Sequence, residues 1–156
     1  MEIYERNINA AVRSDGDDYI LTKASLLDLN HNMRIEIKVR ISDRMIVEAE
    51  AQMTKTPFLI CHQTAHFARN MTGLRIERGI THKLSELFGR SEGCTHLYEL
   101  AVEAIRLSSN VLLGFETGDQ EWRERKLSDE EFMQRAKGFL QNSCLPFKVA
   151  REQGGE

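Results

Sequence analysis

The stretch Met33-Arg34-Ile35-Glu36-Ile37-Lys38-Val39-Arg40-Ile41 alternates apolar and charged residues without a break. Because successive side chains of a strand point to opposite faces, this period of two predicts a β-strand with one buried face. Residues 47–53 alternate in the same way, and Ser42-Asp43-Arg44 between the two stretches suits a turn. We therefore expect a β-hairpin over residues 33–41 and 45–53, with its apolar face buried. The predicted pairs are Ile41 with Met45, Val39 with Val47, Lys38 with Glu48 and Glu36 with Glu50.

The rest of the chain extends this hairpin into a sheet followed by helices. Two more strands are predicted over residues 3–13 and 18–29, and after Thr56 the apolar period becomes helical. We expect helices over about 57–72, 81–88 and 94–113, and a fourth that opens at the capping box Ser128-Asp-Glu-Glu131. Strands first and helices afterwards predict an α+β fold: an antiparallel sheet from the N-terminal third, covered by about four helices. We expect a single domain over residues 1–150 and a frayed tail over 151–156.

Two of these helices carry an apolar stripe that predicts their buried face. The stripe of the third helix consists of Leu97, Ala101, Ala104, Ile105 and Ser108. The stripe of the fourth consists of Phe132, Ala136, Phe139 and Leu140. Between the two helices, residues 117–126 are polar except for Trp122.

Composition and charge exclude several classes of partner. A formal net charge of −3 over 156 residues gives no electrostatic reason to expect nucleic acid or an anionic membrane. The apolar runs are far shorter than the roughly 20 residues that span a bilayer. The chain opens without a basic region followed by an apolar run, and its three cysteines are an odd number at wide spacings. We therefore expect a cytoplasmic protein with reduced thiols, whose partner is a small ligand or another protein.

The residues Gly89-Arg-Ser-Glu-Gly93-Cys94-Thr-His96 bring a thiol and an imidazole to the start of the third predicted helix. Unpaired N–H groups and the helix dipole favour an anion at that position, and a thiolate is such an anion. His96 points about 200° around a regular helix from Cys94, so the two face one site only if Cys94 belongs to the loop. In the alternative reading, Cys94 is a small packing residue in phase with Leu97 and Ala101.

Cys61 and two histidines stand on the first predicted helix. Cys61 is in phase with Ala65 and Ala68, which favours the core, whereas His62 and His66 have the i, i+4 spacing that suits a metal on one face of an α-helix. This spacing has low specificity without the glutamate of a His-Glu-x-x-His motif, and a solvated pair is the more common case. Cys144 follows the fourth helix and is either a packing residue or a third thiol.

These residues also carry a resemblance to a known family. Gly73-Leu-Arg-Ile76, Gly79 and Gly93-Cys94-Thr-His96-Leu97-Tyr-Glu99-Leu100 resemble the bacterial domain-of-unknown-function family 2889, over most of residues 6–145. The resemblance implies a small bacterial protein without an established activity, and it implicates Cys61, Cys94 and His96. A fainter likeness, by analogy alone, is to iron–sulfur scaffold proteins, which also hold three well-separated cysteines after a small sheet.

Three hypotheses for the function follow. In the first, Cys61, Cys94 and His96 bind a metal, zinc or iron, or a small ligand, because thiolates and imidazole suit these metals. In the second, Cys94 is the nucleophile of a thiol enzyme, with His96 or His82 as its base. In the third, the chain is a non-catalytic interaction module whose cysteines only pack. The sequence favours the first of these over the other two.

Overall fold

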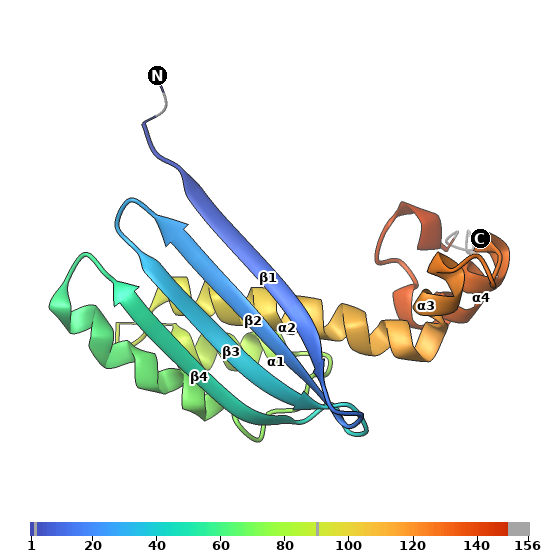
Figure 1. The fold of residues 1–156 in the computed structure, drawn as a ribbon, viewed down its shortest axis with the longest axis horizontal. Coiled ribbons are helices and arrows are strands. Elements are labelled where there is room, and N and C mark those ends of the chain that lie inside the picture. The colour runs from blue at the N-terminus through green and yellow to red at the C-terminus, as the bar shows by residue number, and fades with distance from the viewer. Residues whose placement is uncertain (2, 90, 150–156) are drawn as a thin grey trace, which may run out of the picture. The chain divides into compact units, whose positions relative to one another are not determined.

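The computed structural model describes residues 1, 3–89 and 91–149, so the tail predicted over 151–156 lies outside the described residues. The chain divides into two compact units, Met1–Asn110 and Val111–Glu156. The first unit holds the sheet and the helices that cover it (Figure 1). The chain therefore has the predicted α+β composition, with an antiparallel sheet first and helices after it.

The sheet is a four-stranded antiparallel meander in the order β1-β2-β3-β4. Its strands are β1 Arg6–Asp15, β2 Tyr19–Asp28, β3 Asn32–Arg40 and β4 Ile46–Lys55. Short connections between consecutive antiparallel strands are the simplest way to join neighbours. All four predicted strands are confirmed, with ends that differ by a few residues.

One face of the sheet is apolar and covered by helices, as the period of two requires. In Figure 1 the helices α1 and α2 lie behind the sheet, and the green helix η1 runs alongside β4. The buried side chains of β2 and β3 on this face include Ile20, Ala24, Leu26, Met33, Ile35, Ile37 and Val39. On α2 the whole predicted stripe is buried, from Leu97 to Ser108. The hydroxyl groups of Thr22 and Ser108, 2.7 Å apart, satisfy each other inside this core.

The hairpin of β3 and β4 follows the predicted register in its middle and departs from it at the turn. Lys38 pairs with Glu48 and Glu36 with Glu50, as predicted. The register then shifts by one residue, so that Val39 pairs with Ile46 instead of Val47. The prediction was wrong here because Ile46 also pairs on its other side. Its N–H donates to the carbonyl of Leu74 and its own carbonyl accepts from Gly73, at 2.9 and 2.8 Å.

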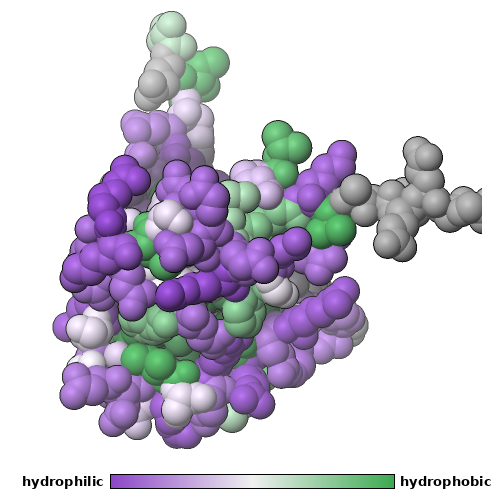
Figure 2. Space-filling view, turned by 90° about the vertical axis from the view of Figure 1, so that its right-hand side faces the viewer, coloured by the Kyte–Doolittle hydropathy of each residue, from purple (hydrophilic) through white to green (hydrophobic). Residues whose placement is uncertain are grey.

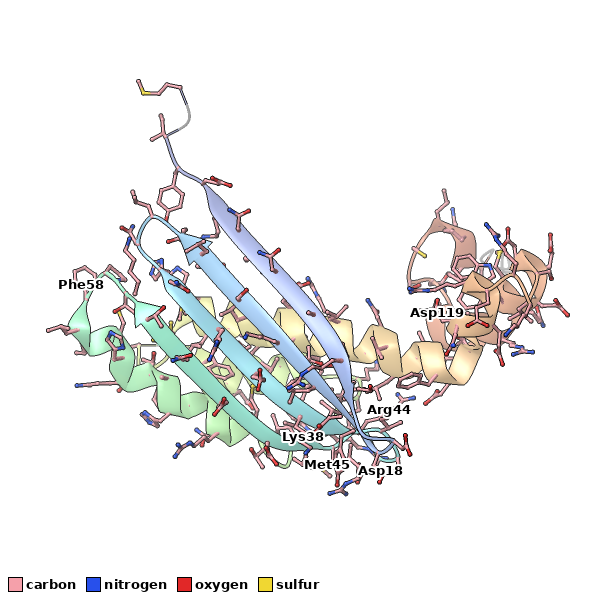
Figure 3. All side chains as sticks on the ribbon, in the orientation of Figure 1. Asp18, Lys38, Arg44, Met45, Phe58 and Asp119 are labelled. Carbon is pink, nitrogen blue, oxygen red and sulfur yellow. The ribbon has the colours of Figure 1, made fainter. Side chains whose placement is uncertain are left out.

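The predicted pair of Ile41 with Met45 is also wrong. Ile41 lies beyond the end of β3, is half-buried, and donates its N–H to the carbonyl of Asp18 in the neighbouring turn, at 2.9 Å. The carbonyl of Met45 accepts instead from the N–H of Arg40, at 2.8 Å. Figure 3 shows Arg44 and Met45 at the same end of the sheet as Asp18, and Phe58 at the other end. Arg44 has a φ of 60°, so the turn contains one left-handed residue that the sequence did not indicate.

The helices of the first unit are η1 Leu59–Met71, α1 Ile80–Phe88 and the first part of α2, which runs over Thr95–Thr117. As predicted, η1 ends just before Gly73, whose φ of 88° suits glycine, and α1 ends at Gly89. The helix begins at Leu59, two residues later than expected, and the hydroxyl of Thr56 donates to the carbonyl of Phe58.

The second unit contains the short helix α3 Asp119–Arg123, α4 Asp129–Leu140 and the 3₁₀ turn η2 Leu145–Phe147. The predicted capping box is confirmed, since Ser128 and Glu131 exchange hydrogen bonds at the start of α4. The Trp122 ring stacks on the ring of Phe132 with centroids 4.6 Å apart. The predicted stripe of α4 holds for Ala136, which is buried, but not for Phe139, which is 56% exposed.

The described surface is largely polar. Hydrophilic side chains cover most of the face in Figure 2, with smaller groups of apolar ones between them. Among the described residues, no helix is both long and apolar enough to cross a membrane.

Candidate functional site

Cys94 immediately precedes α2, as the sequence predicts. Its carbonyl accepts the first hydrogen bond of the helix, from the N–H of Tyr98 at 3.0 Å. Its own N–H donates to the carbonyl of Phe88 at 2.8 Å, which fixes the loop between α1 and α2. A Cβ at Gly93 would lie 1.9 Å from the Phe88 carbonyl oxygen, so only glycine fits before the cysteine.

Cys61 and Cys94 line the same open pocket, which has a volume of about 340 Å³. One wall comes from η1, and the other from the loop residues that lead into α2. Both cysteines are half-buried. His66, Thr64 and Glu92 also line the pocket, so hydroxyl, imidazole and carboxylate groups accompany the two thiols. We call this the cysteine pocket.

The 3₁₀ geometry of η1 decides which of its residues reach the pocket. The sequence predicted an α-helix here, but the segment has three residues per turn, in an unusually long run of 13 residues. Residues three apart therefore share a row, and two adjacent rows line the pocket: Cys61, Thr64 and Phe67, and Ile60, Gln63 and His66. In the third row the last two residues, Ala68 and Met71, are buried in the core, whereas Leu59 and His62 at its start are exposed.

The same geometry separates the two histidines that the sequence places at i, i+4. With three residues per turn, His62 and His66 point about 120° apart instead of along one face. Both side chains are exposed, but His66 lines the cysteine pocket and His62 does not. The pair therefore does not form the two-histidine face that an α-helix would give.

His96 belongs to a different group of side chains, which we call the histidine cluster: Arg6, Asp28, His31, His96 and Glu99. The ring of His96 lies against the ring of His31, with centroids 4.0 Å apart. The Nδ1 of His31 is 2.9 Å from Oδ1 of Asp28, whose Oδ2 accepts from the Arg6 Nε at 3.0 Å. The two other guanidinium nitrogens of Arg6 reach the His96 Nε2 and a carboxylate oxygen of Glu99, each at 3.4 Å. The start of β1, the β2–β3 turn and the first turn of α2 are thus joined.

Asp28 is the ionised centre of this cluster. Its side chain is fully buried. Burial works against ionisation, yet hydrogen bonds from the Asn30 N–H, the His31 ring, the Tyr4 hydroxyl and the His31 N–H hold the pKa of Asp28 well below its ordinary value. With Asp28 ionised, the Nδ1 of His31 is the donor in its hydrogen bond to Oδ1 of Asp28.

The surroundings of His96 favour its neutral form. Burial, the neighbouring His31 and the positive charge of Arg6 lower the pKa of His96, and they outweigh the opposing effects of Glu99 and Asp28. A neutral His96 can accept the Arg6 hydrogen bond at Nε2, so the tautomer with the proton on Nδ1 fits the geometry.

The predicted metal set is therefore divided between two places. Cys61 and Cys94 line the cysteine pocket, and His96 lies in the histidine cluster. Over residues 1, 3–89 and 91–149, no group of three or more histidine, cysteine, aspartate or glutamate side chains is placed to hold a metal ion.

The remaining candidates also lie outside the pocket. The alternative base His82 stands on α1 with a 79% exposed side chain, 3.8 Å from Glu86. Cys144 is exposed in the second unit.

Sequence reasoning missed Arg6, Asp28 and His31. A local signal existed for two of them: Asp28 and His31 bracket a tight turn at the end of a strand, where an aspartate commonly accepts hydrogen bonds from the residues that follow. Nothing local pointed to Arg6, whose partners Asp28 and Glu99 lie 22 and 93 residues further along the chain.

The family model for proteins of unknown function DUF2889 matches residues 5–108. The chain therefore belongs to this family, as its residues suggested. The match ends at 108, short of the predicted 145, and so covers nearly all of the first unit and none of the second. Both the cysteine pocket and the histidine cluster fall inside it, while Cys144 falls outside. No curated protein and no solved structure matches the chain.

Proposed function

We propose that the chain binds a small thiophilic ligand, and that Cys61 and Cys94 are the groups that contact it. The observation that supports this proposal is that two cysteines 33 residues apart in sequence line one open pocket. A pair of inert packing cysteines would be expected inside the core, whereas both of these are half-buried at a cavity. The pocket is also about as large as the smaller ligand sites of proteins.

Zinc and iron are the first ligands to consider within this proposal. Two thiols with the imidazole of His66 and the carboxylate of Glu92 are donors of the kinds that these metals accept. His66, in place of His96, is then the imidazole of the site. Binding would have to draw these side chains together, since no set of three described side chains is already at metal-binding distance.

Cysteine alkylation by iodoacetamide, read peptide by peptide by mass spectrometry, tests the proposal. Anaerobically purified protein is alkylated with and without Zn²⁺, and its zinc and iron contents are measured by elemental analysis. We expect Zn²⁺ to slow alkylation of Cys61 and Cys94 and to leave exposed Cys144 unchanged, so that Cys144 serves as an internal control. Cys61→Ser and Cys94→Ser should each weaken Zn²⁺ binding, and the matched variant Cys144→Ser should not.

Other outcomes separate the competing hypotheses. Rapid alkylation of Cys94 alone, without protection by Zn²⁺ and without bound metal, would replace metal binding by thiol chemistry at Cys94. Slow alkylation of both pocket cysteines in metal-free protein would overturn the proposal and leave an interaction module with packing cysteines.

A further inference from the structure

The outer edge of β1 is an open sheet edge. β1 has ten residues, contains no proline, and pairs with β2 in an unbroken register from Arg6 to Asp15. Among the described residues no strand lies on its other side, because β1 is the first strand of the sheet. The opposite edge is less regular: β4 is bulged near its first residue, Ile46, whose backbone pairs with residues 73–74. Long, regular and uncovered edges are templates for another strand.

The hydrogen bonds of the neighbouring strands show which groups of β1 face outward. The N–H of Asp28 donates to His31, and that of Ile41 donates to Asp18, so even-numbered residues of β2 bond to β3. Odd-numbered residues of β2 therefore bond to the odd-numbered residues of β1 that lie opposite them. The outward N–H and C=O groups of β1 consequently belong to its even-numbered residues: Arg6, Ile8, Ala10, Val12 and Ser14.

The apolar side chains of β1 are left half-covered at this edge. Ile8 and Val12 lie on the covered face of the sheet, because their partners Leu26 and Thr22 are buried there. Yet Ile8 is 43% exposed and Val12 is only half-buried. An additional strand beside β1 would remove more of this apolar surface from water.

We propose that this strand is β1 of a second copy of the chain, paired antiparallel about a two-fold axis at Asn9. In this register Arg6 of each copy pairs with Val12 of the other, and Ile8 with Ala10. The two-fold axis makes each pair occur twice, and the outward N–H and C=O groups of these residues form the hydrogen bonds. Glu5 then lies opposite Arg13 on the solvent face, also twice. Both are exposed, and opposite charges at directly opposed positions stabilise a sheet. The symmetric contact closes on itself, as a two-fold interface must.

The charged side chains favour this register over the alternative shifted by two residues, which also keeps the apolar side chains on the covered face. A shift by two residues places the axis at Ala10 and sets Glu5 opposite Asp15 and Arg13 opposite Asn7. The two facing pairs of like charge would disfavour that arrangement, and the attraction of Arg13 for Glu5 would be lost. A shift by one residue would pair covered-face residues with solvent-face residues.

A charge-swap series measured by sedimentation velocity tests the contact. The wild-type chain should form dimers at high micromolar concentration. Glu5→Arg and Arg13→Glu should each weaken dimerisation by about tenfold or more, because each sets like charges opposite one another at two places. The double variant Glu5→Arg/Arg13→Glu should restore it. A wild-type chain that stays monomeric, or single variants that associate as well as the wild type, would overturn the proposal.

Disulfide cross-linking tests the register of the proposed strand pair without a measurement of dimer affinity. Asn9 opposes itself at a pair without hydrogen bonds, where the Cα atoms of a sheet are about 4.5 Å apart, within reach of a disulfide. In a Cys144→Ser background, Asn9→Cys should give a covalent dimer on mild oxidation. Asn7→Cys, on the same face of the same strand, should not, because Asn7 would lie opposite Ala11. Equal cross-linking of the two variants would contradict the register, and so would none at Asn9→Cys.

Discussion

The cysteine pocket and the histidine cluster meet at the first turn of α2, but their polar groups are satisfied to different degrees. In the cluster, the Asp28 carboxylate is fully buried and Oδ1 alone has three hydrogen-bond partners, at Asn30 N, His31 N and His31 Nδ1. In the pocket, neither Cys61 nor Cys94 has a hydrogen bond to its sulfur among the described residues. A closed network holds elements together, whereas open side chains at a cavity are free to meet a ligand. This difference fits a stabilising role for the cluster and the binding role that we propose for the pocket.

The largest effect should come from removing the charge at the centre of the cluster. Asp28→Asn leaves Arg6 without its buried carboxylate and replaces an acceptor of several hydrogen bonds by a neutral amide. We expect the free energy of unfolding to fall by about 2–4 kcal/mol, measured by urea denaturation. The matched control Asp17→Asn, in the exposed β1–β2 turn, should stay within about 0.5 kcal/mol of the wild type. Similar losses in the two variants would refute the structural role of the cluster.

The second effect is a dependence of stability on pH. The pKa of His96 is lowered in the folded chain by burial, His31 and Arg6, so the unfolded chain takes up this proton more readily. The stability that neutral His96 contributes is therefore present above its ordinary pKa of about 6.5 and is lost as the pH falls through the folded value. Asp28, whose pKa is also lowered, makes a contribution that is lost only at more acidic pH, below about 4.

Unfolding free energies measured between pH 7.5 and 5.5 test the His96 contribution. His96→Gln should flatten their decrease toward acid, because glutamine does not titrate in this range. The exposed His62→Gln serves as the control and should keep the wild-type slope. An unchanged slope in His96→Gln would show that other groups carry the pH dependence.

The sequence predicted the parts of this comparison that depend on local periodicity. Alternation located β3 and β4, and a single stripe from Leu97 to Ser108 located the buried face of α2. The loop glycines placed Cys94 within one residue of the helix start. These features are predictable because each is decided by neighbours along the chain, through the period of two or 3.6 and the caps.

The features that the sequence missed depend on partners distant in the chain. The bulge near Ile46 follows from its pairing with residues 73–74, and the histidine cluster needs Arg6 and His96, which are 90 residues apart. The 3₁₀ form of η1 is a smaller difference in backbone geometry, but it changes which side chains share a face, and so it separated His62 from His66. An error in helix type therefore alters a predicted site more than it alters a predicted fold.

The smallest change in the free energy of unfolding should come from substituting the pocket cysteines. This change distinguishes cysteines that line a binding pocket from cysteines that pack in the core. Cys61→Ala and Cys94→Ala remove half-buried thiols without hydrogen-bond partners among the described residues, so each should lower the free energy of unfolding by less than about 1 kcal/mol. Leu97→Ala, at a fully buried position on the same helix start, should cost about 2–5 kcal/mol. Urea denaturation of the three variants gives the comparison directly. If the free energy of unfolding fell as much for either cysteine variant as for Leu97→Ala, that cysteine would be a core residue. A side chain whose role is to bind a ligand stabilises the complex and contributes little to the stability of the ligand-free protein.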